Sequence, residues 1–439
     1  MKTTSDMSLL TPAIPHTAGE PIRTTAPPPM WHMVLSWFML VPFLFLSANG
    51  TLVPQSGDPA FGATGESPST SLSHMIGTAV VILICGALIV SRLSLVLSAC
   101  RRMKLLLTLP LLAIVSTAWS VQPRKSIVSG IVLLVFTVFA IYVGTKFNLQ
   151  RQFELIMLVG AVALPVSIAL ALFVPTIGSS PLGWRGIFGH KQNCATVCML
   201  WLITALHWRC SGIYQKIFRL MIILMCLAMI VMSLSRTGWA LTLIALCLSA
   251  ALWVMQKMPP KESLLITLLA LPCVGGLAFL VARYSAQITT SVGKDPTLNE
   301  RTVIWAAVWK AISKHPALGY GFAAFWNGLF GASQSVVLSS GWALAQSQNG
   351  YLDVWLGVGA VGVGLVALMV VQAAKNAVLD FHAKGSESYV RWCIVMIVST
   401  LLYNVGESSL GLLHMVWFLF LLACVGLNEV ARKRELSAP

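Results

Sequence analysis

Apolar stretches of about 20 residues recur along nearly the whole chain, and this feature constrains the fold more than any other. A stretch of that length crosses the hydrocarbon core of a bilayer as an α-helix. Hydrophobic residues make up 57% of the 439 residues and charged residues only 10%, so a water-soluble fold could not cover its surface with polar groups. In lipid, only helices and closed β-barrels satisfy all backbone hydrogen bonds. The alternation of apolar and polar residues typical of a membrane β-barrel is absent, which leaves helices. The sequence predicts an all-α polytopic membrane protein.

We predict about twelve membrane-spanning helices. The stretch 1–30, rich in Thr, Pro and Ser, is expected to be a disordered tail rather than a cleavable signal peptide. The predicted spans are 33–49, 75–91, 104–120, 127–145, 154–175, 193–208, 217–235, 237–256, 263–282, 350–373, 390–405 and 409–427. They divide the chain into the tail 1–30, nine helices in 31–283, one large loop in 284–349, three helices in 350–428 and a second tail, 429–439.

Orientation follows from the distribution of Lys and Arg, because cytoplasmic loops retain positive charge. With the N-terminus inside, 19 of the 29 Lys and Arg residues fall on the cytoplasmic side. Both termini are therefore predicted to be cytoplasmic, and the loop 284–349 to be periplasmic. The basic residues form no continuous stripe, so the net charge of +15 does not indicate a nucleic-acid partner. The ten cations predicted on the outer side are Arg124, Lys125, Arg185, Lys191, Arg236, Arg283, Lys294, Arg301, Lys310 and Lys314.

Arg236 is the most anomalous of these outer cations. It lies in the short stretch Ser233 to Gly238 between two apolar runs, where a cation costs about 2 to 3 kcal/mol unless it snorkels or finds a partner. Taken alone, the position of Arg236 would be explained by snorkelling of its side chain to the membrane surface. Arg185, Lys191 and Arg301 are predicted at the same face, however, and several cations there indicate an anion. A guanidinium donates two parallel hydrogen bonds to phosphate, so the predicted ligand is a lipid diphosphate.

The outer loop contains an amphipathic segment from Arg301 to Lys314. Its apolar residues fall on one helical face, with Lys310 opposite them. We expect this helix to lie flat at the membrane surface, with its tryptophans at headgroup level and Arg301 turned toward lipid headgroups. It would serve as a substrate lid or as an ordinary connector. After His315-Pro316 ends the helix, a tight turn is predicted at Gly319-Tyr320-Gly321.

Five segments carry a family resemblance: Ser116 to Pro123, Trp184 to Asn193, Ser233 to Gly238, Gly293 to Gly321 and Ser347 to Asp353. Through them the chain resembles the O-antigen ligase and Wzy-type polymerase superfamily, and within it the exopolysaccharide polymerases of the succinoglycan type. The resemblance covers roughly residues 100–430. Each segment alone is weak, but all five occur in the family's order with the large loop in the expected place. A sixth segment, Asn404 to Ser408, resembles the polymerase branch.

The resemblance implies a fold and an activity. The fold would be that of GT-C membrane glycosyltransferases, and the reaction would transfer a sugar chain from an undecaprenyl-diphosphate donor to a sugar hydroxyl, without a metal or other cofactor. The acceptor would be another lipid-linked repeat unit in a polymerase, or the lipid A core in an O-antigen ligase. The segments around Gly293 and Asn404 favour the polymerase. A bacterial inner-membrane location is implied too, with a chain-length regulator and export machinery as further partners.

The resemblance also assigns roles to residues. Arg185, Arg236 and Arg301 would hold the diphosphate and offset negative charge on the leaving group, where electrostatic stabilisation matters most. His190, a lone histidine predicted at the interface, could accept a proton or simply form local hydrogen bonds. The other predicted substrate contacts are Lys191, His190, Tyr320, Asn349 and Tyr351.

One position departs from the family pattern. A histidine proposed to activate the acceptor hydroxyl is replaced by Gln348, and glutamine cannot take a proton at neutral pH. Gln348 is then a catalytic candidate only as a positioning group, which leaves Glu407 and Asp353 as candidates for the general base. Glu407 lies between two apolar runs, where an acid is expensive and serves either a function or an outer arginine. Asp353 could instead pair with an arginine or accept from backbone donors at its helix start.

Two other functions are open to a sequence of this kind. A transporter or flippase for lipid-linked repeat units would also have about twelve helices, but transporters usually consist of two similar halves with binding groups at mid-membrane. This sequence shows no internal repeat, and its polar anomalies gather at one face. A catalytically inactive assembly partner is the third interpretation, because the family histidine is absent.

Overall fold

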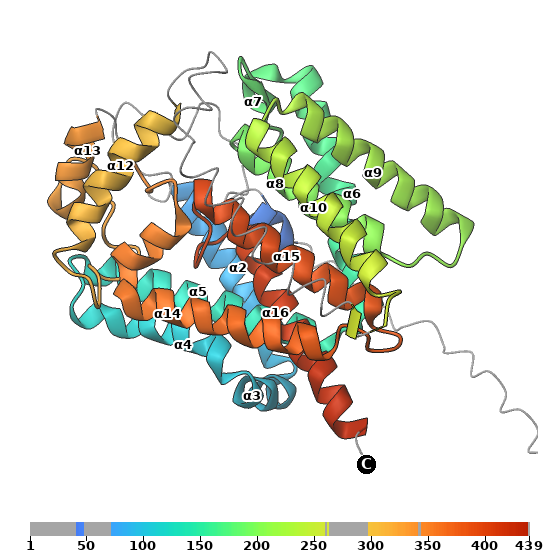
Figure 1. The fold of residues 1–439 in the computed structure, drawn as a ribbon. Coiled ribbons are helices and arrows are strands. Elements are labelled where there is room, and N and C mark those ends of the chain that lie inside the picture. The colour runs from blue at the N-terminus through green and yellow to red at the C-terminus, as the bar shows by residue number, and fades with distance from the viewer. Residues whose placement is uncertain (1–40, 48–71, 260, 263–296, 341–343, 438–439) are drawn as a thin grey trace, which may run out of the picture. The chain divides into compact units, whose positions relative to one another are not determined.

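The computed structural model describes residues 41–47, 72–259, 261–262, 297–340 and 344–437 (Figure 1). These residues are almost entirely helical, with helix at 41–47 and one antiparallel pair of strands, β1 (Ser179–Ser180) and β2 (Gly183–Trp184). The helices are α2 (Leu72–Val90), α3 (Leu93–Arg102), α4 (Lys104–Val115), α5 (Pro123–Lys146), α6 (Leu149–Phe173), α7 (Pro175–Gly178), α8 (Lys191–His207), α9 (Ile213–Met232), α10 (Arg236–Met255), α12 (Thr297–Ile312), α13 (Gln334–Ser340), α14 (Gly350–Leu379), α15 (Glu387–Gly406) and α16 (Met415–Ser437), with short 3-10 helices η3 (Ser116–Ala118) and η4 (Gly331–Ser333). The predicted all-α polytopic fold is confirmed.

Seven of the described helices are long and apolar enough to cross a membrane, and counting α2 and α3 as one bent span gives eight. α4 and α8 occupy the predicted spans 104–120 and 193–208 but have only 12 and 17 residues. Both are shorter than the roughly 20 residues of a full crossing. The predicted span 263–282 lies outside the described residues, as do Arg283, Lys294 and most of 33–49. The number twelve stays a prediction.

The cytoplasmic loop predicted after residue 91 contains a helix. α3 follows α2 at an angle of 92°. Its residues Val96 and Ala99 are buried against the rest of the protein. Ten residues with a charged end are too short and too polar to be recognised as a span, which is why hydropathy alone assigned them to a loop.

The loops predicted to be cytoplasmic meet at one end of the helices. Arg209 after α8 lies 3.5 Å from Glu387 at the start of α15, and Arg434 of α16 lies 3.0 Å from Asp380 at the end of α14. The Gln256 side chain donates to the Glu387 carbonyl at 3.1 Å. These contacts agree with the predicted grouping of loops, while the side of the membrane on which this end lies stays a prediction.

The opposite end gathers the segments that carry the candidate site residues. α8 and α10 start there side by side, since a Cβ added to Gly238 would lie 2.3 Å from the Cβ of Ala195. α15 runs the other way, because Trp392 near its start donates to Thr204 near the end of α8 at 2.9 Å. The starts of α8 and α10 and the end of α15 therefore lie at one end.

The turn predicted at Gly319-Tyr320-Gly321 is confirmed, and it packs against a break in α14. Both glycines have a positive φ, 66° and 101°, which disfavours any larger residue. The backbone N–H of Tyr320 donates to the carbonyl of Leu356 at 2.7 Å. α14 loses its helical geometry just beyond, at Gly359. The turn thus bonds backbone groups that the broken helix leaves without an internal partner.

The apolar face of α12 is covered by protein. Ile304, Val308 and Ile312 are at most 3% exposed and share a core with residues of α13 and α14, which lie beside α12 in Figure 1. Trp309 packs edge-on against Trp355 of α14, with ring centroids 5.2 Å apart. α13 and α14 supply the apolar surface for this face, so the face is not free to meet lipid as expected, and the position of α12 relative to the membrane surface stays a prediction.

Candidate functional site

The start of α14 is fastened to the end of α15. Asn349 caps α14, since its Oδ1 accepts from the backbone N–H groups of Tyr351 and Leu352 at 3.1 and 3.2 Å. The backbone N–H of Gly350 donates to the carbonyl of Glu407, just after α15, at 2.9 Å. The candidate residues on these two elements, distant in sequence, are therefore neighbours in space.

Gln348 precedes this cap in an unusual backbone conformation. Its φ of 58° is rare for a residue other than glycine, and such conformations persist only where the surroundings hold them. The buried Ser347 does so from one side, because its hydroxyl donates to the carbonyl of Asn349 at 2.8 Å. From the other side, the Asn349 amide donates to the carbonyl of Val405 at 3.2 Å. No described residue hydrogen-bonds the half-buried Gln348 side chain, which leaves its amide free to contact a ligand.

The carboxylate of Asp353 accepts hydrogen bonds from three separate segments. Trp326 Nε1 donates to Oδ1 at 2.9 Å, and the backbone N–H of Ser347 lies 3.1 and 3.2 Å from the two carboxylate oxygens. The hydroxyl of Ser408 donates to Oδ2. Asp353 thus has the backbone donor suggested by sequence. With both oxygens engaged, its geometry favours a structural role over proton transfer.

Arg301 and Glu407 form a largely buried ion pair. Arg301 Nη2 lies 3.2 Å from Glu407 Oε1, and the two side chains are 25% and 8% exposed. A Cβ at Gly406 would lie 3.0 Å from Arg301 Nη1, so this glycine lets the guanidinium approach. Burial raises the pKa of Glu407 to about 7, although the Arg301 charge acts to lower it. A carboxyl group of that pKa can accept a proton near neutral pH.

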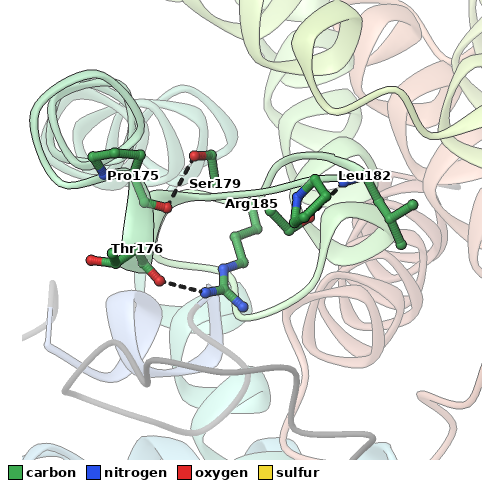
Figure 2. Close-up of a pocket in the computed structure, with 7 residues that line it drawn as sticks. Pro175, Thr176, Ser179, Leu182 and Arg185 are labelled. Carbon is green, nitrogen blue, oxygen red and sulfur yellow. Dashed lines mark hydrogen bonds between the residues drawn. The ribbon is translucent and has the colours of Figure 1, made fainter.

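Arg185 lies in the loop between α6 and α8, directly after β2. It is 6% exposed; its Nε donates to the carbonyl of Ile177 at 2.8 Å and its Nη2 to that of Thr176 at 2.9 Å. Figure 2 shows this guanidinium reaching across the loop beside an open pocket of about 710 Å³. Arg185 therefore holds the loop folded on itself. The pocket is lined by Pro175, Thr176, Ser179, Ser180, Pro181, Leu182 and Arg185.

His190 and Lys191 follow this loop and begin α8. His190 is the N-cap, and its Nδ1 accepts from the backbone N–H of Gln192 at 3.3 Å. Lys191 Nζ donates to the carbonyl of Leu182 at 3.1 Å. Both residues line a small hollow together with Arg185. His190 thus has the local hydrogen-bonding role that its sequence position allowed.

Arg236 starts α10 beside the same loop. A Cβ at Gly183 would lie 2.1 Å from the carbonyl of Ser233, so the β1–β2 hairpin touches the turn that precedes Arg236. Arg236 is exposed, and no described residue forms a hydrogen bond or ion pair with its side chain. It is the cation of this loop region whose guanidinium is most open to an external anion.

Two tyrosines implied as substrate contacts use their hydroxyls inside the protein. The Tyr320 hydroxyl donates to the carbonyl of Ala311 at 2.8 Å, and the residue is 7% exposed. The Tyr351 hydroxyl donates to the carbonyl of Leu401 at 2.8 Å. Both side chains support the packing around the start of α14.

The structure thus brings the candidates into two groups at the same end of the helices, since α15 packs against both α8 and α10. The sequence predicted that the candidate residues share one face of the protein, but it did not predict that they form two groups. The α14 group consists of Arg301, Gln348, Asn349, Asp353 and Glu407; the hairpin group consists of Arg185, His190, Lys191 and Arg236.

Three residues to which the sequence assigned no role complete the α14 group. Trp326 and Ser408 bind Asp353, as described above. Asn404 fixes the turn after Glu407, because its Oδ1 accepts from the backbone N–H of Ser409 at 2.8 Å. Ser408 and Asn404 bound the segment that resembles the polymerase branch, which was a usable signal. Trp326 has no local signal, because its partner lies 27 positions away.

Among the residues that the structure describes, no group of three or more His, Cys, Asp or Glu side chains could hold a metal ion. Asp353 accepts from neutral donors and Glu407 faces an arginine. Metal independence stays a prediction.

Apolar spanning helices and a cation-rich end define the class of this protein, a multi-pass membrane protein. Residues 220–367, about a third of the chain, match the family model of the O-antigen ligases. Residues 220–367 are therefore similar to the O-antigen ligases, which confirms the resemblance to the superfamily of ligases and Wzy-type polymerases. The matched residues include Arg236, Arg301 and Gln348 and end before Glu407. No curated protein matches the chain.

Proposed function

We propose that this protein polymerises undecaprenyl-diphosphate-linked oligosaccharide repeat units into exopolysaccharide at the periplasmic face of the bacterial inner membrane. The observation that carries the proposal is the buried pair of Arg301 and Glu407. It combines a cation suited to phosphate with a group suited to accepting a proton, and Arg301 lies within the segment that matches the family model. Both termini are then cytoplasmic, and a chain-length regulator and export machinery are the expected partners.

Arg236 and Arg301 are the proposed diphosphate ligands. Arg236 is exposed, and a quarter of the Arg301 side chain remains accessible beside Glu407. A guanidinium keeps further N–H donors when one of them is occupied, so Arg301 can bridge Glu407 and a phosphate oxygen. Arg185 instead holds the pocket loop in shape through the carbonyls of Thr176 and Ile177.

Glu407 is the proposed general base. The acceptor hydroxyl oxygen forms a bond to the anomeric carbon of the donor sugar, and the bond from that carbon to the diphosphate oxygen breaks. The hydroxyl proton passes to Glu407, and the undecaprenyl diphosphate leaves with its negative charge stabilised by Arg236 and Arg301. Gln348 positions the acceptor through its amide, and Asp353 holds the backbone that carries Gln348.

The test compares Arg236→Ala with Arg124→Ala in cells. Arg124 is also exposed and predicted on the outer side but belongs to neither group. Arg236→Ala should abolish secreted polymer while lipid-linked single units accumulate in the outer leaflet, and Arg124→Ala should leave polymer unchanged. A flippase would trap the units in the inner leaflet, and a ligase would leave finished chains unattached to lipid A. Normal polymer from Arg236→Ala would refute the proposal.

A further inference from the structure

The short helix α3 lies across the end of α2, which occupies the predicted span 75–91. α2 is apolar along its length, and α3 follows it at 92°. A helix perpendicular to a span runs roughly parallel to the membrane surface. Its last residue, Arg102, lies 3.3 Å from Glu429 of α16, which places α3 at the end where the predicted cytoplasmic segments meet.

The sides of α3 differ in chemistry. Val96 and Ala99 are buried against the protein, which fixes the rotation of the helix. Leu93 and Leu97, one turn apart, are each 47% exposed and form a half-exposed apolar side. Ser98 belongs to a third, polar side and is exposed. Apolar and polar sides along an in-plane helix are typical of helices that sit at the boundary of headgroups and acyl chains.

Positive charge surrounds this apolar side without compensation. Arg92, Arg101 and Lys104 are exposed, and none of them has an acidic partner among the described residues. The sequence contains no Asp or Glu in residues 67–153. Glu429 pairs with Arg102, which leaves the other three cations for an external anion.

We propose that α3 is an interfacial helix that binds anionic phospholipid headgroups, with Leu93 and Leu97 inserted at the acyl boundary. Arg92, Arg101 and Lys104 then contact lipid phosphates. Charge complementarity selects this occupant, because the membrane surface beside an in-plane helix supplies both the apolar and the anionic partner. The inference does not depend on the proposed polymerase activity.

The first test asks which side of α3 meets lipid. A photo-cross-linking phenylalanine analogue replaces Leu97 or, as the matched control, Ser98 in the full chain reconstituted in phosphatidylglycerol nanodiscs. Lipid adducts are expected at position 97 and only weakly at position 98, as read by mass spectrometry. Equal yields at the two positions, or no adduct at 97, would overturn the inserted orientation.

The second test asks whether charge selects the lipid. The variant Arg92→Gln/Arg101→Gln should retain phosphatidylglycerol roughly 25-fold more weakly, about fivefold for each cation removed, with phosphatidylcholine retention unchanged. Lys310→Gln/Lys314→Gln removes the same charge from the opposite end and should have no effect. Arg92→Lys/Arg101→Lys should restore retention, which separates lost charge from misfolding. Undiminished phosphatidylglycerol in the Gln variant, or no recovery with Lys, would overturn the proposal.

Discussion

The α14 group and the hairpin group lie at the same end of the helices but hold their cations differently. Arg301 faces a buried carboxylate, whereas Arg185 and Lys191 donate to backbone carbonyls and Arg236 is exposed. The chain has no Asp or Glu between residues 155 and 261, so the segment that carries the hairpin group contains no acidic residue. The proposed function accordingly assigns anion binding to both groups and proton transfer to the α14 group alone.

The largest expected effect comes from Arg301→Ala, which leaves Glu407 buried without its cation. Removing one partner of a buried pair costs roughly 3 to 5 kcal/mol, and polymerisation should fall at least about 100-fold as leaving-group stabilisation is lost. Thermal melting and a polymerisation assay measure the two effects. The double variant Arg301→Ala/Glu407→Gln should recover stability but no activity. A double variant that regains activity would contradict the assigned roles, and Lys310→Ala is the matched control on α12.

The next prediction concerns pH. Burial raises the pKa of Glu407 from its usual 4.5 to about 7. Between pH 4.5 and pH 7, the folded protein therefore binds a proton that the unfolded chain has released. The stability contributed by that proton is present at pH 4.5 and is lost as the pH rises through 7. Activity should move in the opposite direction, because the base must be ionised, and should fall about tenfold per pH unit below 7. Melting and rate profiles of the parent and of Glu407→Gln test this, since both trends should flatten in the variant.

A smaller effect is expected from Asp353→Asn. An amide cannot accept at both termini, so at least one of the bonds from Trp326, Ser347 and Ser408 is lost, which costs about 1 to 3 kcal/mol. As a positioning residue, Asp353 should lower kcat about tenfold when changed, roughly 1.4 kcal/mol of barrier, while the pH midpoint set by Glu407 stays in place. If the pH dependence disappeared instead, Asp353 would be the base. Ser408→Ala removes one of the same bonds and should show a weaker form of the same change.

The smallest effect is expected from Arg185→Lys. An ammonium group lacks the planar fork that reaches the carbonyls of Thr176 and Ile177 together, so the pocket loop loosens. We expect KM for the lipid-linked substrate to rise a few-fold, on the order of 1 kcal/mol, with kcat nearly unchanged. Steady-state kinetics separate the two parameters. A large fall in kcat would show that Arg185 acts on the reacting phosphates directly and would remove the contrast with Arg301.

The sequence by itself determined the features that depend on neighbouring residues. Apolar runs predicted the membrane class, the glycines flanking Tyr320 predicted the turn, and the isolated acid Glu407 indicated an arginine partner. These follow from hydropathy, backbone sterics and the expense of a buried charge, all of which are local.

Only the tertiary structure decided which partners the remaining residues have. It covered the apolar face of α12 with protein, engaged Asp353 with Trp326 and Ser408, and divided the cations into two groups. It also turned α3 across the end of α2. A pattern in sequence specifies that a group must be buried or bonded, but contacts between residues tens of positions apart depend on how the helices pack, and packing is a property of the whole fold.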